Sequence, residues 1–241
     1  MASGETSAAH EQQVQSMFDR IAGHYDVMNS VMSAGLHHRW RARAADLSEL
    51  KTGDRAIDLC CGTGDLAFEL KRRVGPDGEV VGLDFSEQML ELANRKAAQE
   101  QLPVSFIHGN ALDLPFKDDY FDAATVGFGV RNLADLDGGI AEMARVVKPG
   151  GRVVILEITT PQHAPMSWFY SVWFDQIVPL LGSAAGDPDA YSYLPESVRR
   201  FPEAQELAAR MDGLGLRAIR YIMLAGGIVA LHVGTVPATS R

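Results

Sequence analysis

The sequence predicts an α/β fold whose seven-stranded sheet is mostly parallel, with helices on both faces and an antiparallel last strand. Three observations lead to this expectation. Short apolar runs alternate with helical segments, a glycine turn follows the first run, and two apolar runs near the end are joined by Ala225-Gly226-Gly227. The 241 residues, 46% of them hydrophobic, suffice for one domain with a large core.

The first half of the chain supplies the strands and helices that flank the glycine turn. The strand-like runs are Arg55–Cys60, Glu79–Leu83 and Val104–His108. The predicted helices between them are Asp65–Arg73 and Ser86–Gln99, and the second of these begins with a serine, a residue type that favours the helix cap.

The second half continues the alternation and ends in a hairpin. The predicted elements are, in order, strand Phe121–Val126, helix Asp135–Val147, turn Lys148–Gly151 and strand Arg152–Ile158. The apolar runs Leu216–Leu224 and Ile228–Val236 then predict the sixth and seventh strands, the last of them antiparallel.

One domain accounts for nearly the whole chain. We expect residues 1–10 to form a disordered tail and residues 11–241 a single domain, with a helical lid at 11–50 and a substrate-side insertion at 160–202. The first 19 residues contain no Lys or Arg and no continuous apolar stretch, so neither a signal peptide nor a membrane-spanning helix is expected.

Charge and cysteine content narrow the range of partners. The net charge of −9 disfavours nucleic acid, because phosphate backbones attract clustered Lys and Arg. The short basic clusters Arg39–Arg43 and Arg199-Arg200 are expected to be solvated helix faces. Adjacent cysteines rarely form a disulfide, so Cys60 and Cys61 suit a reducing cytoplasm. No spacing typical of metal ligands is present in the sequence.

Gly62-Thr63-Gly64 and Asp84 predict a site for a cofactor that contains adenosine. The glycines allow a sharp bend and a close approach of backbone to ligand. Asp84 ends the next apolar run, where an acid accepts hydrogen bonds from ribose hydroxyls. The turn also fits the Gly-x-Gly-x-x-Gly/Ala pattern of dinucleotide sites, so a nicotinamide or flavin enzyme is a rival interpretation at this point.

Two further features favour S-adenosylmethionine. Asp58 lies in the strand before the glycines, and Asn110-Ala111 follows the third strand. Both features resemble the Rossmann-like class I S-adenosylmethionine-dependent methyltransferases. The resemblance implies that Asp58 orients the glycine loop and the methionine amino group, while Asn110 and Ala111 face adenine. We therefore expect S-adenosylmethionine as the cofactor.

Motifs outside this core resemble a narrower family. They are Tyr25-Asp26-x-Met28-Asn29 with Ser33-x-Gly35-x-His37-x-x-Trp40, then Gly127–Asn132, then Tyr191-x-Tyr193-Leu194-Pro195-x-Ser197 with Gly226–His232. Together they are similar to the ubiquinone/menaquinone biosynthesis C-methyltransferases, over about residues 18–234. Some relatives have a serine that contacts the cofactor at the position of Gly127, so that contact is not carried over to this chain.

The resemblance implies C-methylation of a prenylated quinol ring, with demethylmenaquinol favoured as substrate. A ubiquinone-pathway benzoquinol, another small-molecule methyl acceptor and a non-catalytic S-adenosylmethionine-binding regulatory module are the alternatives. Nucleic-acid amino-methyltransferases usually place Asn/Asp-Pro-Pro-Tyr/Phe after the fourth strand, where this chain has Gly127-Phe128-Gly129-Val130.

Quinol methylation needs a group that stabilises a phenolate, because ring carbon becomes nucleophilic when an ortho or para hydroxyl loses its proton. Arg131 is the first catalytic candidate, since a fixed cation stabilises developing charge and the residue follows the fourth strand. Its high pKa argues against a role as the base itself. A surface ion pair of Arg131 with Asp135 or Asp137 is the alternative interpretation.

Tyr25 and His37 are the other catalytic candidates. Tyr25 is expected in a lid over the cofactor, with a core-edge aromatic as the alternative. His37 is a candidate base because histidine titrates near working pH, and His38 and His232 share that property. Asp26 is placed equally well to cap the start of a helix.

Substrate contacts are expected from segments outside the core, at Asn132, Trp168, Tyr191, Tyr193 and His232. The aromatic-rich stretch 168–181 suits a lining for an isoprenoid tail or a peripheral membrane contact. Core packing and a homodimer interface are the alternatives. We expect a cytoplasmic protein that associates reversibly with the inner face of the cytoplasmic membrane.

Overall fold

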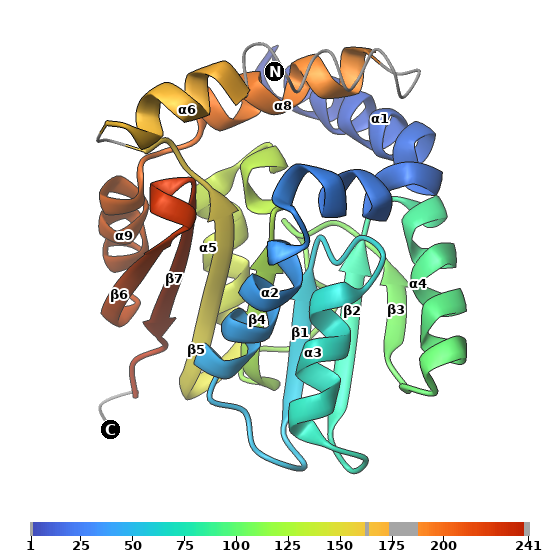
Figure 1. Cartoon of the computed structure of the whole chain (residues 1–241). Coiled ribbons are helices and arrows are strands. Elements are labelled where there is room, and N and C mark those ends of the chain that lie inside the picture. Colours follow the sequence, from blue (N-terminus) through green and yellow to red (C-terminus); the bar gives the residue numbers. More distant parts are fainter. Residues whose placement is uncertain (1, 162–163, 174–187, 239–241) are drawn as a thin grey trace.

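A seven-stranded sheet in the order β3-β2-β1-β4-β5-β7-β6 organises the protein (Figure 1). The computed structural model describes residues 2–161, 164–173 and 188–238. β1 to β5 pair in parallel, and β7 runs antiparallel to both of its neighbours. The strands are β1 (Arg55–Leu59), β2 (Glu79–Asp84), β3 (Ser105–His108), β4 (Phe121–Gly127), β5 (Val147–Ile158), β6 (Arg217–Leu224) and β7 (Val229–Thr235). The predicted sheet and its antiparallel last strand are confirmed.

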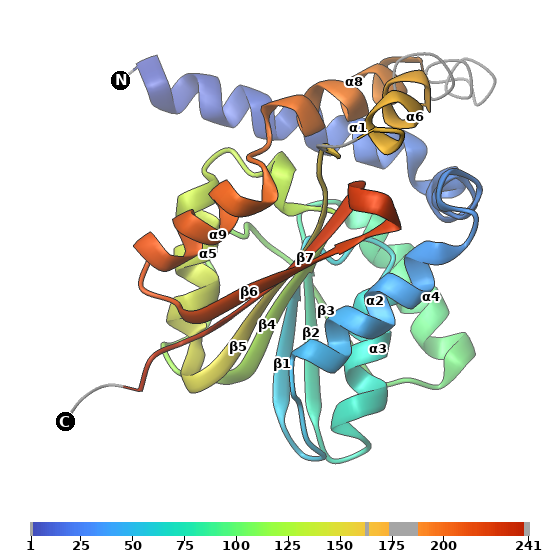
Figure 2. The same ribbon diagram turned by 60° about the vertical axis from the view of Figure 1, so that its left-hand side comes forward.

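Helices cover both faces of the sheet, with α2, α3 and α4 on one side and α5 and α9 on the other (Figure 2). Their bounds are α2 (Leu36–Leu47), α3 (Asp65–Val74), α4 (Glu87–Glu100), α5 (Leu136–Val146) and α9 (Ala204–Gly213). Each amphipathic helix turns its apolar stripe inward: Leu66 and Leu70 of α3 join one core, and Ile140 and Met143 of α5 join the other. Fully burying one such side chain contributes roughly 1.5–3 kcal/mol.

A third layer lies across the carboxyl-terminal edge of the sheet (Figure 1). It consists of α1 (Ala2–Ser33), α6 (Met166–Val172) and α8 (Pro188–Arg200). Val14 and Met17 of α1 are buried against Phe85, Tyr193 and other apolar side chains. This layer therefore covers the edge at which parallel sheets bind ligands.

Two local expectations differ from the structure. Residues 2–10, predicted as a disordered tail, belong to α1, and Ala2, Glu5, Ala8 and Ala9 in this segment are good helix formers. Lys148–Gly151, predicted as a turn, belongs to β5 as an irregularity: Phe121 pairs with Val147, and Ala123 with Arg152. The extra residues bend the strand there, and Gly150 takes a positive φ of 86°.

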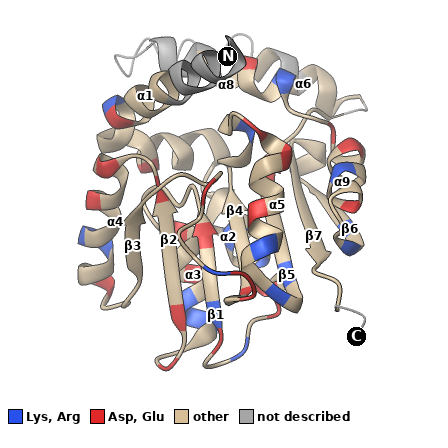
Figure 3. Cartoon of the chain, turned by 180° about the vertical axis from the view of Figure 1, so that it is seen from behind, with Lys and Arg blue, Asp and Glu red and all other residues tan. Residues whose placement is uncertain are grey.

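The short connections are a turn of 3-10 helix after β4, η1 (Val130–Asn132), and a second before β7, η3 (Ala225–Gly227). Seen from behind, acidic and basic residues intersperse along α4, α5 and α9 (Figure 3). Opposite charges such as Arg210 and Asp137 pair across these surfaces at 3.3 Å. Mixed pairing of this kind differs from the basic face that nucleic-acid binding requires.

Candidate active site

The glycine turn lies where the carboxyl ends of three neighbouring strands meet. β1 pairs with β2 on one side and β4 on the other, so the residues after these strands share one edge. Gly62 and Gly64 have φ values of 54° and 88°. A Cβ on Gly64 would lie 2.7 Å from Cζ of Phe106, so both conformation and space require glycine there.

Asp84, the last residue of β2, holds this turn in place. Its Oδ2 accepts a hydrogen bond from the Gly62 backbone N–H at 2.7 Å, and its Oδ1 accepts one from Ser86 at 2.9 Å. Burial raises the pKa of the carboxyl group, and the backbone donors oppose that rise. Two backbone bonds thereby fix the position of an acid beside the turn.

Asp58 lies deeper than the sequence suggested. Its Oδ1 accepts a hydrogen bond from Thr125 Oγ1 at 2.6 Å, and its side chain also receives one from the Ala67 backbone. Burial raises its pKa to about 7. Asp58 thus joins β1 to β4 and to the first turn of α3, whereas the residue that bonds the Gly62 backbone is Asp84. The Gly62 backbone N–H thus donates to Asp84, and the contact of Asp58 with the methionine amino group stays a prediction.

A cavity of about 310 Å³ opens beside the turn, and we call it the cofactor-side cavity. Asp84 places a carboxylate in its wall, and Leu83, Met89 and Leu112 add apolar side chains. Leu112 N–H donates to Asn110 Oδ1 at 2.9 Å, which fixes that amide at the cavity wall. These residues fit an adenosine group. The predicted cofactor residues in its wall are Gly62, Asp84, Asn110 and Ala111.

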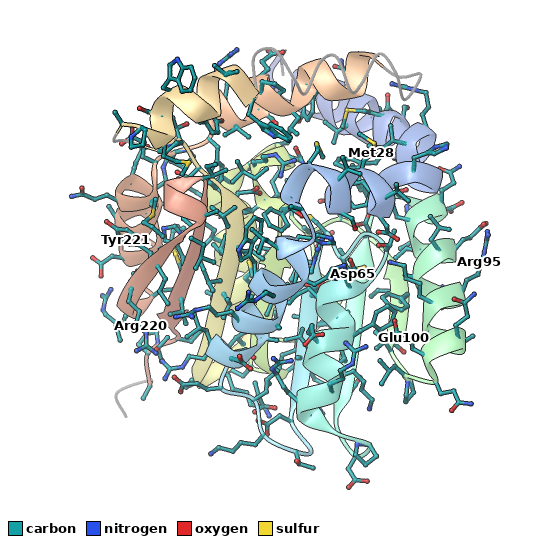
Figure 4. The ribbon with its side chains drawn as sticks, viewed as in Figure 1. Met28, Asp65, Arg95, Glu100, Arg220 and Tyr221 are labelled. Atoms are coloured by element: carbon teal, nitrogen blue, oxygen red, sulfur yellow. The ribbon has the colours of Figure 1, made fainter. Side chains whose placement is uncertain are left out.

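Thr63 belongs to a polar cluster behind that wall, which we call the lid clasp (Asp26, Thr63, Asp65 and Lys96). Lys96 Nζ lies 2.6 Å from Asp26, 2.8 Å from Asp65 and 3.0 Å from Thr63 Oγ1, which itself donates to Asp26 at 2.7 Å. Asp65 begins α3 below the helix that carries Met28 (Figure 4). Asp26, offered as a helix cap, instead lies inside α1 and ties it to α4 through Lys96 and to the glycine turn through Thr63.

A second cavity of about 480 Å³ adjoins the first, and we call it the apolar cavity. Phe18, Tyr25 and Phe128 line both cavities. Much of its remaining wall consists of apolar side chains from the covering layer and the sheet edge, including Met17, Ile21, Met28, Met32, Trp40, Ile158 and Leu194. Tyr25 and Phe128 therefore stand between a polar-edged cavity and a largely apolar one.

Arg131 lines the apolar cavity and forms a buried ion pair that the sequence analysis missed. Its Nη1 lies 2.8 Å from Oε1 of Glu157, and the two side chains are 8% and 1% exposed. Arg131 Nε also donates to Ser197 Oγ at 3.3 Å. The alternative of a surface pair with Asp135 or Asp137 is wrong. Glu157 is the one acidic residue in the otherwise apolar second half of β5, and this feature could have predicted a buried partner for a cation.

His37 is buried on α2 and lines the apolar cavity. Its Nδ1 is bonded to Arg41, and its Nε2 lies 3.1 Å from Ser30 Oγ. Burial and the Arg41 charge lower its pKa to about 4, so the ring is neutral at neutral pH. Arg41, predicted on a solvated face, is only 6% exposed. His37, His38 and Asp65 place ligand atoms within 4.8 Å of one another, but the guanidinium among them opposes a metal cation.

Tyr25 is held at the boundary between the two cavities. Burial raises the pKa of its hydroxyl, while the charges of Arg41 and Arg131 and a hydrogen bond with Asn29 oppose the rise. The hydroxyl is therefore neutral at working pH. The Tyr193 hydroxyl donates to Oδ1 of Asn132 at 3.2 Å and so joins a residue of the apolar cavity to one of the cofactor-side cavity.

The remaining substrate candidates lie elsewhere. His232 is absent from the walls of both cavities: its Nε2 lies 2.8 Å from the Ala204 carbonyl oxygen and its ring stacks on Tyr221. Burial lowers its pKa, and we withdraw it as a substrate contact. Trp168 is 71% exposed on α6. Tyr191 lies on α8, but its side chain and most of the stretch 168–181 fall outside the described residues.

A model of the ubiE/COQ5 methyltransferase family matches residues 6–236. The chain belongs to this family. The demethylmenaquinone methyltransferase of Desulfitobacterium hafniense is 45% identical over 238 residues, which cover 98% of this chain and 93% of that protein. The protein of the same name from Thermus thermophilus is 46% identical over 222 residues, covering 92% of this chain and 100% of its own length.

Solved structures agree on the fold. A SAM-dependent methyltransferase from Thermotoga maritima superposes with a TM-score of 0.64 at 18% identity, over 92% of this chain and 99% of that one. Another from Aquifex aeolicus gives 0.57 at 19% identity, over 78% and 84%. Family and fold together identify a methyltransferase that uses S-adenosylmethionine, which settles the cofactor question left open by the glycine pattern.

Proposed function

We propose that this protein methylates a ring carbon of a prenylated demethylmenaquinol, with S-adenosylmethionine as donor, in menaquinone biosynthesis. One observation carries the proposal: an apolar cavity with a buried arginine in its wall adjoins the cofactor-side cavity across Tyr25 and Phe128. The names of the curated relatives point to the same substrate class. Demethylated benzoquinols are the nearest alternative substrates, and the assay below includes one.

When bound, the cofactor supplies a methyl group on a positively charged sulfur, and the S–CH₃ electron pair stays on sulfur as the thioether forms. In the quinol, a ring C–H bond is replaced by a C–C bond, and one proton is released overall. The protein must favour the phenolate, whose charge makes the ring carbon nucleophilic. Arg131 performs this task from the cavity wall, because the N–H groups of its guanidinium cation donate to oxygen.

The same contacts limit the choice of base. A pKa of about 4 makes His37 a weak base, and its two ring nitrogens already meet Arg41 and Ser30. We therefore assign His37 the task of positioning Arg41. Tyr25, neutral at the boundary of the two cavities, orients the ring and excludes water.

The apolar cavity also suits the start of an isoprenoid tail. Two of its lining residues, Val31 and Leu36, are 53% and 40% exposed, so they form its mouth. We propose that the tail leaves here and that this rim contacts the cytoplasmic face of a membrane without inserting. Among the described residues, no helix is long and apolar enough to span a bilayer. A homodimer that covers the exposed Trp168 of α6 is the alternative.

A methyl-transfer assay tests the proposed function. Demethylmenaquinol and a demethylated benzoquinol, each reduced anaerobically, are supplied at equal concentration with labelled S-adenosylmethionine. We expect turnover of the naphthoquinol at least about tenfold faster, equivalent to about 1.4 kcal/mol in the barrier. Cofactor binding by calorimetry without turnover on either quinol overturns the proposal and favours a regulatory module.

Liposome flotation tests the membrane contact separately. Val31→Glu and Leu36→Glu should each abolish co-flotation with vesicles of anionic and zwitterionic lipid. Met223→Glu is the matched control, because that residue is 41% exposed on β6 and does not line the cavity. Equal flotation of all variants contradicts the proposed surface, and a dimer in ultracentrifugation that Trp168→Glu dissociates supports the alternative.

A further inference from the structure

A second guanidinium lies in the wall of the apolar cavity. Arg41 of α2 and Arg131 of η1 both line it, although they lie far apart in the sequence. Arg41 is 6% exposed, and its neighbours Arg39 and Arg43 are both exposed. A long charged side chain is rarely buried unless a partner or a ligand uses its charge.

Arg41 lines the cavity and has a more distant counterion than Arg131. Its Cζ lies 5.4 Å from the centre of the Phe128 ring, and it is bonded to Nδ1 of His37. His37 is neutral at working pH, and an imidazole in either protonation state carries no negative charge to act as a counterion. The nearest carboxylate, Asp65, is 3.6 Å away and makes its closer bond, of 2.8 Å, with Lys96. Arg131, in contrast, has Glu157 at 2.8 Å.

Phe128 relates the two guanidinium groups in space. Arg41 lies over its ring, and Arg131 donates from Nη1 to its backbone carbonyl oxygen. The charges of both arginines lower the pKa of the Tyr25 hydroxyl against the effect of burial, and Arg41 has the larger effect. Both positive charges therefore face the part of the cavity that adjoins the cofactor-side cavity.

A quinol ring carries two oxygens in a 1,4 relation, on opposite sides of the ring. Guanidinium groups only donate hydrogen bonds, and both a phenolate and a hydroxyl oxygen accept them. We propose that Arg41 is a further substrate-binding residue, which donates to one quinol oxygen while Arg131 donates to the other. This assignment rests on the proposed function, and it makes the second oxygen a determinant of substrate recognition.

Binding of two matched ligands tests the assignment without turnover. Protein saturated with S-adenosylhomocysteine is titrated anaerobically with a 2-prenylated 1,4-dihydroxynaphthalene and with the 1-naphthol that lacks the second hydroxyl. The wild-type protein should bind the dihydroxy ligand more tightly. Arg41→Met should lower the affinity for the dihydroxy ligand about 10- to 100-fold, as expected for the loss of a hydrogen bond from a charged donor. It should lower the affinity for the naphthol less than about threefold.

The controls separate recognition from folding. Arg43→Met removes an exposed arginine from the same helix and should change neither affinity. Arg41→Lys should recover part of the lost discrimination, because it restores the charge but not the planar fork. If Arg41→Met lowers the affinity for both ligands equally and leaves that for S-adenosylhomocysteine unchanged, this inference alone is overturned. A wild-type protein that binds S-adenosylhomocysteine but neither naphthalene ligand overturns the proposed function and this inference with it.

Discussion

Glu157 holds Arg131 from two directions. Its Oε1 accepts from the guanidinium Nη1 at 2.8 Å, and its Oε2 accepts from the backbone N–H of the same arginine at 3.3 Å. The first contact fixes the side chain, and the second fixes the start of η1 against the end of β5. Arg131 is thereby held at the cavity wall by a residue that lies 1% exposed and outside both cavity linings.

Glu157→Gln should damage both stability and catalysis. The substitution leaves the Arg131 charge buried without a counterion, and breaking a buried pair from one side typically costs about 3–5 kcal/mol. Urea unfolding measures that loss, and kcat should fall with it. The double variant Arg131→Met with Glu157→Gln should regain much of the stability without regaining activity. Additive losses in this cycle contradict the coupling.

Asp84→Asn should weaken cofactor binding selectively. An amide nitrogen in place of one carboxylate oxygen meets the N–H of either Gly62 or Ser86, donor against donor. We expect the Kd for S-adenosylhomocysteine to rise about 10- to 100-fold in calorimetry. The control is Asp113→Asn, because Asp113 is an exposed acid that directly follows the lining residue Leu112 in the sequence. Equal affinities for the two variants argue against a role for Asp84 in binding.

Lys96→Met should loosen the lid clasp. Without its ammonium group, Asp26 on α1 and Asp65 on α3 face each other as like charges. Hydrogen exchange should become faster along the second half of α1, and the cofactor should dissociate faster. The control is Arg95→Met, because Arg95 points outward from α4 and pairs with Glu91 on the same helix (Figure 4). Identical exchange in the two variants would show that the clasp does not hold α1.

The local sequence predicted many strand ends, helix caps and turns, because these features depend on only a few neighbouring residues. Asp84 ends β2 as expected, and Ser86 caps α4 by accepting from the Met89 backbone at 3.2 Å. Glycine is needed at position 64 for its positive φ, whatever the rest of the fold does. Such features depend on backbone chemistry and periodicity, which a single sequence contains.

Side-chain roles set by distant partners were missed. Arg39, Arg41 and Arg43 look like one basic cluster, but residues two apart on a helix face different directions. Only the packing of α2 against α3 and Phe128 shows that Arg41 points inward. The pairing of Asp26 with Lys96 spans 70 residues of chain in the same way. No periodicity predicts contacts of this kind.

Asp58 gives the fold a measurable pH dependence. Burial raises its pKa to about 7 from 3.8, so the folded protein keeps a proton that the unfolded chain releases. Since the folded state binds more protons between these values, the Asp58 contribution to the unfolding free energy falls as pH rises from about 4 to about 7, then stays constant. Asp58→Asn removes this titration and keeps an oxygen acceptor for the Thr125 hydroxyl. We expect the stability of the variant relative to wild type to increase across that range in urea titrations at stepped pH. Other titrating groups cancel in this difference, so parallel curves would mean that Asp58 is ionised in the folded protein throughout.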